Sequence, residues 1–290
     1  MEKETVKNSD NAHGGSLDIP ANGDVKETVK YSDNGKTLVS YRGDASTFII
    51  PDGVTEIGDR AFWDCDTLCS VTIPDSVTRI GHCAFSSCCA LTSVRIPKGV
   101  REIGAAVFLG CDALTSVIVQ PGNPFYDSRG GCNGIIRTAD NTLVATCPAT
   151  VIAEGVTTIG EFAFISSHAT SIRIPDSVRC IEESAFDGCI HLATLILPER
   201  MTSIGEAAFT ECRALTSIDI PGSVTDIGNE AFWATGLQEM RVHWAEPDRV
   251  TVGNLFKGTA DAITLRVPAG TAEAYRRHPY FSRCGAIVEE

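Results

Sequence analysis

The chain repeats itself every 23 residues, and this period constrains the fold more than any other feature of the sequence. Three successive copies read IPDGVTEIGDRAFWDCDTLCSVT, IPDSVTRIGHCAFSSCCALTSVR and IPKGVREIGAAVFLGCDALTSVI. One phenylalanine position recurs along the chain, at Phe62, Phe85, Phe108, Phe164, Phe186, Phe209 and Phe232. Self-similarity at such a period indicates a solenoid, in which each unit buries its apolar face by stacking on its neighbours.

Within one unit the apolar positions follow V-x-x-I-G-x-x-A-F-x-x-C-x-x-L-x-x-V-x-I-P, which suits neither one long helix nor one long strand. The L-x-x-V-x-I-P segment alternates apolar residues with period two and predicts a short strand closed by proline. V-T-x-I-G predicts a second extended segment, and x-x-A-F-x-x-C has the i, i+3, i+4 spacing of one helical turn. We therefore expect one coil per unit, with the strands stacked in parallel.

The repeat is interrupted once. Between residues 121 and 150 the strand-like runs 135–138 and 142–147 flank a turn, and the period resumes at Val151, so we predict a β-hairpin excursion within a single domain with one continuous core. In front of the first coil, VKYS and KTLVSY flank Asp-Asn-Gly and predict a hairpin cap over 26–47. The expected order is a disordered segment 1–25, this cap, a solenoid over 48–267, and a C-terminal cap over 268–290 with a short helix at 273–280.

The motif I-P-x-x-V-x-x-I-G-x-x-A-F-x-x-C-x-x-L-x-x-V, which covers about residues 48–241, resembles the BspA subclass of leucine-rich repeats. The resemblance implies a curved right-handed superhelix of the α/β class, rich in strand, with about seven to eight coils and a parallel sheet on its concave side. It also implies a surface or secreted protein that adheres to host matrix or plasma proteins. The insert NPFYDSRGGCNGIIRTADNTLVATC and the closing TLRVPAGTAEAYRRHPYF resemble members from the Bacteroides group.

The twelve cysteines point to packing rather than to chemistry. Five share one repeat position, which predicts a buried ladder of Cys65, Cys88, Cys111, Cys189 and Cys212. Cys132 and Cys147 flank the inserted hairpin and could form a disulfide or remain two free thiols. No pair of cysteines or histidines has a matched zinc spacing, and the signatures of metalloproteases, serine hydrolases, P-loops and dinucleotide sites are absent from the sequence. We expect no enzyme activity, no metal and no cofactor.

Charge and hydropathy narrow the partners. A net charge of -13 disfavours nucleic acid, and no apolar run reaches the length of a membrane span. The first thirty residues lack the apolar segment of a secretory signal, so the sequence leaves a cytoplasmic location open beside the surface location that the resemblance implies.

We expect a monomer that binds a protein ligand, such as a host extracellular protein, through the concave sheet. The variable outward positions of that sheet are Thr72, Arg95, Ile118, Arg173, Ile196, Asp219 and Arg241. Trp63 and Trp233 follow inward phenylalanines and should face the convex side, where they offer a competing surface. An intracellular scaffold and a glycan-binding protein are the alternative functions.

Overall fold

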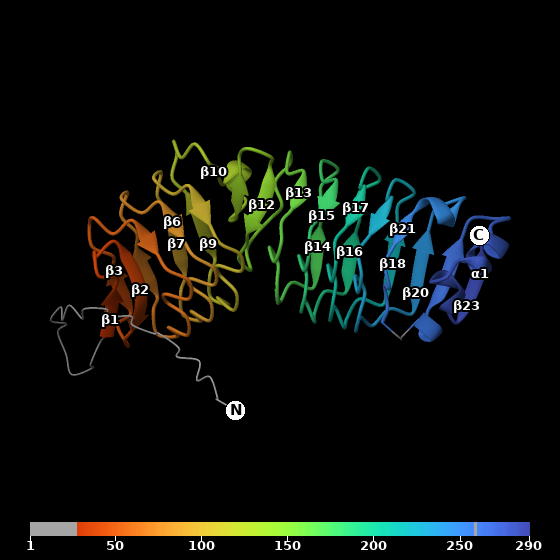
Figure 1. Cartoon of the computed structure of the whole chain (residues 1–290), viewed down its shortest axis with the longest axis horizontal. Helices are drawn as coiled ribbons and strands as arrows, with labels where there is room; N and C mark the ends of the chain where they lie inside the picture. Colours follow the sequence, from red (N-terminus) through yellow and green to blue (C-terminus); the bar gives the residue numbers. More distant parts are fainter. Residues whose placement is uncertain (1–27, 258–259) are drawn as a thin grey trace, which may run out of the picture.

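The computed structural model describes residues 28–257 and 260–290, and in these residues the chain winds into an elongated solenoid of about 11 turns (Figure 1). The predicted leucine-rich-repeat fold is thus confirmed, with more turns than the seven to eight expected. The difference arises because the coils near the C-terminus keep the shape but lose the A-F and I-P signatures by which we counted. The expectation of disorder for residues 1–25 falls outside the described residues.

The L-x-x-V-x-I-P segments form what we call the long-strand column, in which strands of three or four residues stack in parallel. Within its three sheets, β3 to β9, β14 to β16 and β18 to β23, successive strands pair without offset, so that Val94 lies opposite Val117 and Ile218 opposite Met240. The predicted concave sheet corresponds to this column. Its strands are β3 (Thr47–Ile49), β5 (Ser70–Thr72), β7 (Ser93–Ile96), β9 (Ser116–Val119), β14 (Ser171–Arg173), β16 (Thr194–Ile196), β18 (Ser217–Ile220), β20 (Glu239–Val242), β22 (Thr264–Val267) and β23 (Ala286–Glu289).

The V-T-x-I-G segments form a second stack, the short-strand column. Its parallel strands are β4 (Glu56–Ile57), β6 (Arg79–Ile80), β8 (Glu102–Ile103), β13 (Thr158–Ile159), β15 (Cys180–Ile181), β17 (Ser203–Ile204), β19 (Asp226–Ile227) and β21 (Thr251–Val252). A glycine follows each of these strands except β15, which Glu182 follows. Consecutive coils approach closely there: a Cβ atom on Gly104 would lie 2.5 Å from the backbone nitrogen of His82.

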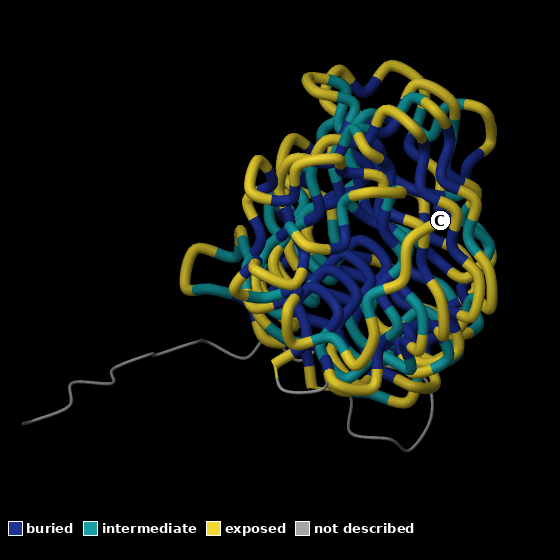
Figure 2. The backbone as a smooth tube through the Cα atoms, turned by 90° about the vertical axis from the view of Figure 1, so that its right-hand side faces the viewer, coloured by how far each residue is buried: buried dark blue, intermediate teal, exposed yellow. Residues whose placement is uncertain are grey.

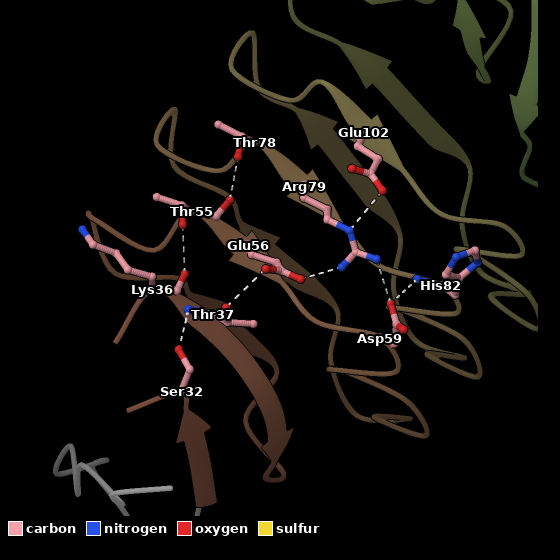
Figure 3. A network of polar contacts seen from close by, with 10 residues as sticks. All are labelled: Ser32, Lys36, Thr37, Thr55, Glu56, Asp59, Thr78, Arg79, His82 and Glu102. Atoms are coloured by element: carbon pink, nitrogen blue, oxygen red, sulfur yellow. Dashed lines mark hydrogen bonds and ion pairs between the residues drawn. The ribbon is translucent and has the colours of Figure 1, made fainter. Parts of the chain in front are cut away.

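Side chains on the short-strand column link neighbouring coils. Figure 3 shows the guanidinium of Arg79 in ion pairs with Glu56 and Asp59 of the preceding coil and with Glu102 of the following coil. These groups are partly exposed, so each pair contributes at most about 1 kcal/mol. We conclude that this network of ion pairs helps to hold neighbouring coils together.

The prediction of a helical turn for x-x-A-F-x-x-C is wrong. In the first coil Arg60 and Asp64 have φ angles of 54° and 64°, in the left-handed region. Because left-handed and right-handed residues alternate in this turn, every second backbone N–H points along the solenoid axis toward the next coil. The N–H of Phe62, for example, donates to the carbonyl of Ala84 at 2.8 Å. The apolar spacing of such a turn equals that of a helix, which is why the sequence misled us. Among the described residues the only α-helix is α1 (Ala272–Arg277), within the predicted C-terminal cap.

The inward phenylalanines and cysteines fill the centre of the solenoid, which Figure 2 shows as a buried interior surrounded by exposed turns. The rings of Phe186 and Phe209 stack with centroids 5.3 Å apart and planes inclined by 11°. The five ladder cysteines are buried free thiols, as predicted, and the Cys88 thiol donates to the carbonyl of Phe62 at 3.1 Å. The interaction with the Cys111 thiol, together with burial, raises the pKa of Cys88 to about 12.

A Cys88→Ser variant should therefore fold with a modest loss of stability. The hydroxyl keeps the Phe62 carbonyl as an acceptor but is buried in an apolar layer, so we expect a loss toward the lower end of about 1–3 kcal/mol in the free energy of unfolding. Urea denaturation measures the loss. In the native protein Cys88 should resist alkylation at neutral pH, because its raised pKa keeps the thiol protonated and burial excludes the reagent. Rapid native-state labelling of the ladder would contradict this account.

Two hairpins interrupt or begin the stack. At the front, β1 (Thr28–Tyr31) pairs antiparallel with β2 (Thr37–Arg42), and β2 continues the short-strand column by pairing with β4. At the insertion, β11 (Ile135–Arg137) pairs antiparallel with β12 (Thr142–Ala145), and β12 likewise pairs with β13. The inserted hairpin therefore has the geometry of a second N-terminal cap.

The remaining elements are short. They are β10 (Tyr126–Asp127) and the 3-10 turns η1 (Arg129–Gly131), η2 (Pro247–Arg249), η3 (Ala260–Ala262) and η4 (Phe281–Arg283).

The buried residues form two clusters instead of the one continuous core that we expected. The first extends from Val29 to Cys147 and the second from Cys132 to Phe281, and both include residues of the inserted hairpin. The hairpin separates the two clusters because its strands present opposite faces to them: Ile135 packs in the first cluster and Ile136 in the second.

Candidate functional site

The long-strand column presents a row of outward side chains, interrupted between β9 and β14, and all seven predicted positions lie in it. Strand pairing places Arg95 opposite Ile118 and Arg173 opposite Ile196. The outward side chains alternate along each strand with the buried ones, since successive residues of a strand point to opposite faces. We call this row the long-strand face and include in it Val151, which lies in no strand but lines a groove together with Arg173: Ile49, Thr72, Arg95, Ile118, Val151, Arg173, Ile196, Asp219 and Arg241.

Two members of the long-strand face were missed in the sequence. Ile49 is 73% exposed and lies opposite Thr72, and Val151 is 70% exposed. Ile49 precedes the first full repeat, and Val151 directly follows the insertion, so neither was aligned with the other strands. Extending the register backward from Val156, which corresponds to Val54 in the first coil, would have found Val151.

Exposed aliphatic side chains make the long-strand face unusual for a solvated sheet. Ile196 is 70% exposed and Ile118 41%. With Ile49 and Val151 they form four apolar positions within a face whose other column is mostly serine and threonine. Scattered apolar residues need no explanation, but a row of them on one face marks an interaction surface.

Over most of the long-strand face, the arginine side chains form no ion pairs with other residues of the described chain. Arg95 and Arg173 are exposed, and neither side chain makes an ion pair or hydrogen bond with another residue of the ranges 28–257 and 260–290. The C-terminal end differs. There Arg241 pairs with Glu290 at 2.8 Å and lowers the pKa of that carboxyl, and Asp219 contacts His243 at 2.6 Å. The unused cations therefore lie in the middle of the face.

The face is hollowed where the long-strand column is broken between β9 and β14. A groove of about 600 Å³ opens there. Arg129, Val151, Glu154, Arg173 and Pro175 are among the residues that line it. Arg129 forms an ion pair with Asp127 at 2.8 Å. Arg173 is therefore the cation of this groove whose side chain has no acidic partner among the described residues. The groove adds depth to an otherwise flat surface.

The tryptophans provide a weaker competing surface. Trp63 is 47% exposed, as predicted. Trp233 is only half-buried, with the Lys257 ammonium 4.7 Å from its ring centroid. Trp244 is buried, and its indole N–H donates to the carbonyl of Val224 at 2.8 Å. The three therefore do not form one platform for stacking against sugars.

Cys132 and Cys147 are buried free thiols in the structure and pack in different core clusters. The Cys132 sulfur contacts the carbonyl of Gly134 at 3.5 Å, and the Cys147 sulfur contacts that of Asn133 at 3.2 Å. Their disulfide stays a prediction. Within the described ranges no group of three or more His, Cys, Asp or Glu side chains could hold a metal ion. Nor does any helix in those ranges combine the length and the apolar character that crossing a membrane requires.

Comparisons with known proteins agree with this architecture. The family model described as BspA type Leucine rich repeat region matches six copies, over residues 39–127 and 146–247. A leucine rich cell surface protein from Faecalibacterium prausnitzii is 30% identical over 84% of this chain, with a TM-score of 0.58. This chain spans 60% of the length of that protein.

Two further solved structures share the fold. The pneumococcal vaccine antigen PcpA has a TM-score of 0.64 at 17% identity, over 85% of this chain and 68% of the antigen. A leucine-rich repeat protein from Bacteroides ovatus has a TM-score of 0.51 at 19% identity, over 94% of this chain and 77% of its own. No curated protein sequence matches the chain significantly. Since the repeat model covers most of the sequence, the chain belongs to the BspA-type leucine-rich repeat family.

Proposed function

We propose that this protein is a non-catalytic module that binds another protein through its long-strand face and acts as a monomer in adhesion at the cell surface. The observation that carries the proposal is the row of exposed aliphatic side chains at Ile49, Ile118, Val151 and Ile196. Each such side chain gains about 1.5–3 kcal/mol when a partner removes it fully from water. Arg95 and Arg173, which have no partner in the described part of the chain, supply charged contacts beside them.

The dimensions of the face suit a macromolecule. Ten strands of the long-strand column, about 4.8 Å apart and about 12 Å long, present roughly 500–600 Å². One partner in a typical protein complex contributes about 800 Å², so the face and its rims approach that size. A surface location is supported by relatives whose names describe a cell surface protein and a vaccine antigen.

An intracellular scaffold is the second candidate. It is favoured by the free thiols, since the exposed Cys69 and Cys89 would oxidise readily in an extracellular medium. Subcellular fractionation of the native organism separates the two. Recovery in the soluble intracellular fraction alone would support the scaffold and contradict adhesion.

The binding proposal predicts a selective loss of affinity. Four changes on the face remove two aliphatic side chains and reverse two charges: Arg95→Glu, Ile118→Ser, Arg173→Glu and Ile196→Ser. Against a panel of purified extracellular-matrix and plasma proteins, we expect this variant to lose binding by at least about 100-fold, because it alters the centre of the interface. A glycan array run in parallel tests the glycan-binding alternative.

A matched control variant makes the same kinds of change elsewhere: Trp63→Ser, Ile190→Ser, Arg213→Glu and Arg249→Glu, all at exposed positions. Circular dichroism should show that both variants keep the native fold. The proposal expects the control to bind as the unmodified protein does. If the control loses binding and the four-residue variant of the face keeps it, recognition lies on the other side of the solenoid.

A further inference from the structure

The seam between the coil that follows the insertion and the coil of β14 is open along the long-strand column. In the first pair of coils the N–H groups of Cys69 and Ser70 donate to the carbonyl of Ser46 at 2.8 and 3.1 Å. The N–H groups of Thr170 and Ser171 stand at the same repeat positions and donate to no described residue of the coil before them. The groove of about 600 Å³ opens where these bonds are absent. We call it the seam groove.

The seam groove has apolar walls and a closed end. Val151, Ile152 and Pro175 are among the residues that line it, and Val151 is 70% exposed. Beyond the groove the N–H of Gly155 donates to the hydroxyl of Ser177 at 3.1 Å and joins the two coils. An added strand would have to break this bond to separate the coils. The groove therefore suits a side chain that a partner inserts rather than a whole strand.

Two residues that line the seam groove carry hydrogen-bond donors without an acceptor among the described residues. One donor is the guanidinium of Arg173. The other is the backbone N–H of Ala153, which replaces the proline that other coils have at this position, as at Pro51 and Pro74. Proline has no N–H, so this coil carries a donor that those coils lack. A carboxylate accepts hydrogen bonds from both kinds of donor.

The other charged side chains of the seam groove do not neutralise Arg173. Arg129 forms its ion pair with Asp127 at 2.8 Å. Glu154 lines the same groove, yet it makes no ion pair with any residue that the structure describes. The chain as a whole carries 37 acidic against 24 basic side chains, so a cation without an acidic partner stands out. The groove therefore presents the positive charge of Arg173 to a ligand.

Aliphatic side chains flank this cation. Strand pairing places Ile196 opposite Arg173, and Ile196 is 70% exposed. Val151 precedes Arg173 by the 22-residue spacing of this coil and lines the groove with it on the other side. A small inorganic anion would pair with the guanidinium but leave both aliphatic side chains in water. The site is therefore complementary to a carboxylate that has apolar neighbours, as in a polypeptide.

We propose that the seam groove binds an aspartate or glutamate side chain of the partner protein, flanked in the partner by aliphatic residues. This inference rests on the proposed function of the long-strand face and defines one of its contacts. The carboxylate accepts from the guanidinium of Arg173 and from the N–H of Ala153, and the flanking aliphatic residues cover Val151 and Ile196. An exposed ion pair alone adds little affinity, so the apolar cover and the ion pair act together.

A peptide library tests the chemistry of the groove. The probe is a random dodecapeptide library displayed on phage, first depleted on the Arg173→Gln variant and then selected on the unmodified protein. Selected peptides should contain an aspartate or glutamate next to an aliphatic residue. When that acidic residue is replaced by its amide in a synthetic peptide, affinity for the unmodified protein should fall at least about tenfold, because the charge-assisted hydrogen bonds are lost.

Glu154→Gln is the matched control, because it neutralises a charge of the opposite sign in the same groove. This variant should bind the acidic peptides at least as tightly as the unmodified protein does, whereas Arg173→Gln should lose at least about tenfold. Amide hydrogen exchange at Ala153 should slow by at least about tenfold when a selected peptide is added, because its N–H gains an acceptor. Thermal melts establish that both variants are folded.

Several results would overturn the assignment: a selection that yields no binder, selected peptides without an acidic residue, or peptides that lose affinity for Glu154→Gln. The last of these would assign the groove to a basic group. The two proposals fail separately. If a partner protein is lost by the four-residue variant of the long-strand face but binds Arg173→Gln unchanged, the proposed function stands and the carboxylate site fails. If acidic peptides bind as expected but no extracellular protein binds through the face, the adhesion function fails instead.

Discussion

Residues 124–290, expressed alone, should fold into a stable solenoid, whereas residues 1–123 alone should not. The C-terminal fragment retains the whole second core cluster, from Cys132 to Phe281. It also retains its own cap, because β12 pairs with β13 as β2 pairs with β4 at the front of the chain. Asp140 and Asn141 precede Thr142 much as Asp33 and Asn34 precede Thr37, so even the turn chemistry of the two caps is alike.

The N-terminal fragment ends on an uncovered apolar layer. In the intact chain the first core cluster includes Ile135, Ala145 and Cys147 of the inserted hairpin, which belong to the other fragment. Without them Phe108 and Val117 lose their cover. Exposing a few such side chains costs about 1.5–3 kcal/mol each, which together is comparable with the 5–15 kcal/mol that stabilises a typical domain.

Circular dichroism and thermal denaturation of the two fragments decide the matter. We expect a cooperative transition for residues 124–290, and aggregation or a low melting temperature for residues 1–123. Extending the N-terminal fragment to residue 150 restores the hairpin and should restore its transition. Two equally stable fragments, or an unfolded C-terminal fragment, would show that the hairpin is not a cap.

The coil was predictable because its residues carry a redundant signal. Phe85, Cys88 and Leu91 recur in register in the neighbouring units, and a position that must be apolar in every copy points inward. The same register placed Arg95 and Ile118 side by side on one face, as the strand pairing shows. The face that we propose for binding was thus located by the same periodicity that defined the fold.

The conformation of the A-F turn was not predictable from its apolar spacing. Helical turns and the alternating-hand turn observed here both bring Ala61, Phe62 and Cys65 to one side. The two conformations differ in the hydrogen-bond acceptor of the Phe62 N–H, which here is a carbonyl of the next coil. That hydrogen bond exists only because the coils stack, so no local pattern records it.

The break in the stack was recognised in the sequence, but its consequences were not. Gly130, Gly131 and the hairpin signal located the insertion. They could not show that the hairpin covers one coil and caps the next, because both roles depend on which strand lies beside β12. The N–H groups of Ala106 and Phe108 donate to no residue of the described chain, and this follows from that tertiary arrangement alone.

Phe186→Ala should destabilise the protein by about 3–5 kcal/mol, the usual cost of removing a large aromatic side chain from a packed core. Phe186 is fully buried and stacks between Phe164 and Phe209, with ring centroids 5.0 and 5.3 Å away. The backbone around it is fixed by axial hydrogen bonds on both sides, so the cavity cannot close by local collapse. Urea denaturation measures the change, with Phe125→Ala as the control.

Phe125 is 40% exposed and lies outside both core clusters, so its replacement should cost no more than about 0.5 kcal/mol. The two variants together separate a stacked core from a generally aromatic chain. Phe186 belongs to the second cluster, which residues 124–290 retain. Phe186→Ala should therefore lower the free energy of unfolding of this fragment, expressed alone, by the same amount as in the full chain. A much smaller loss of unfolding free energy in the full chain than in the fragment would mean that the first cluster stabilises the second across the inserted hairpin. A loss below about 1 kcal/mol in both would show that the phenylalanine stack is not the main support of the core.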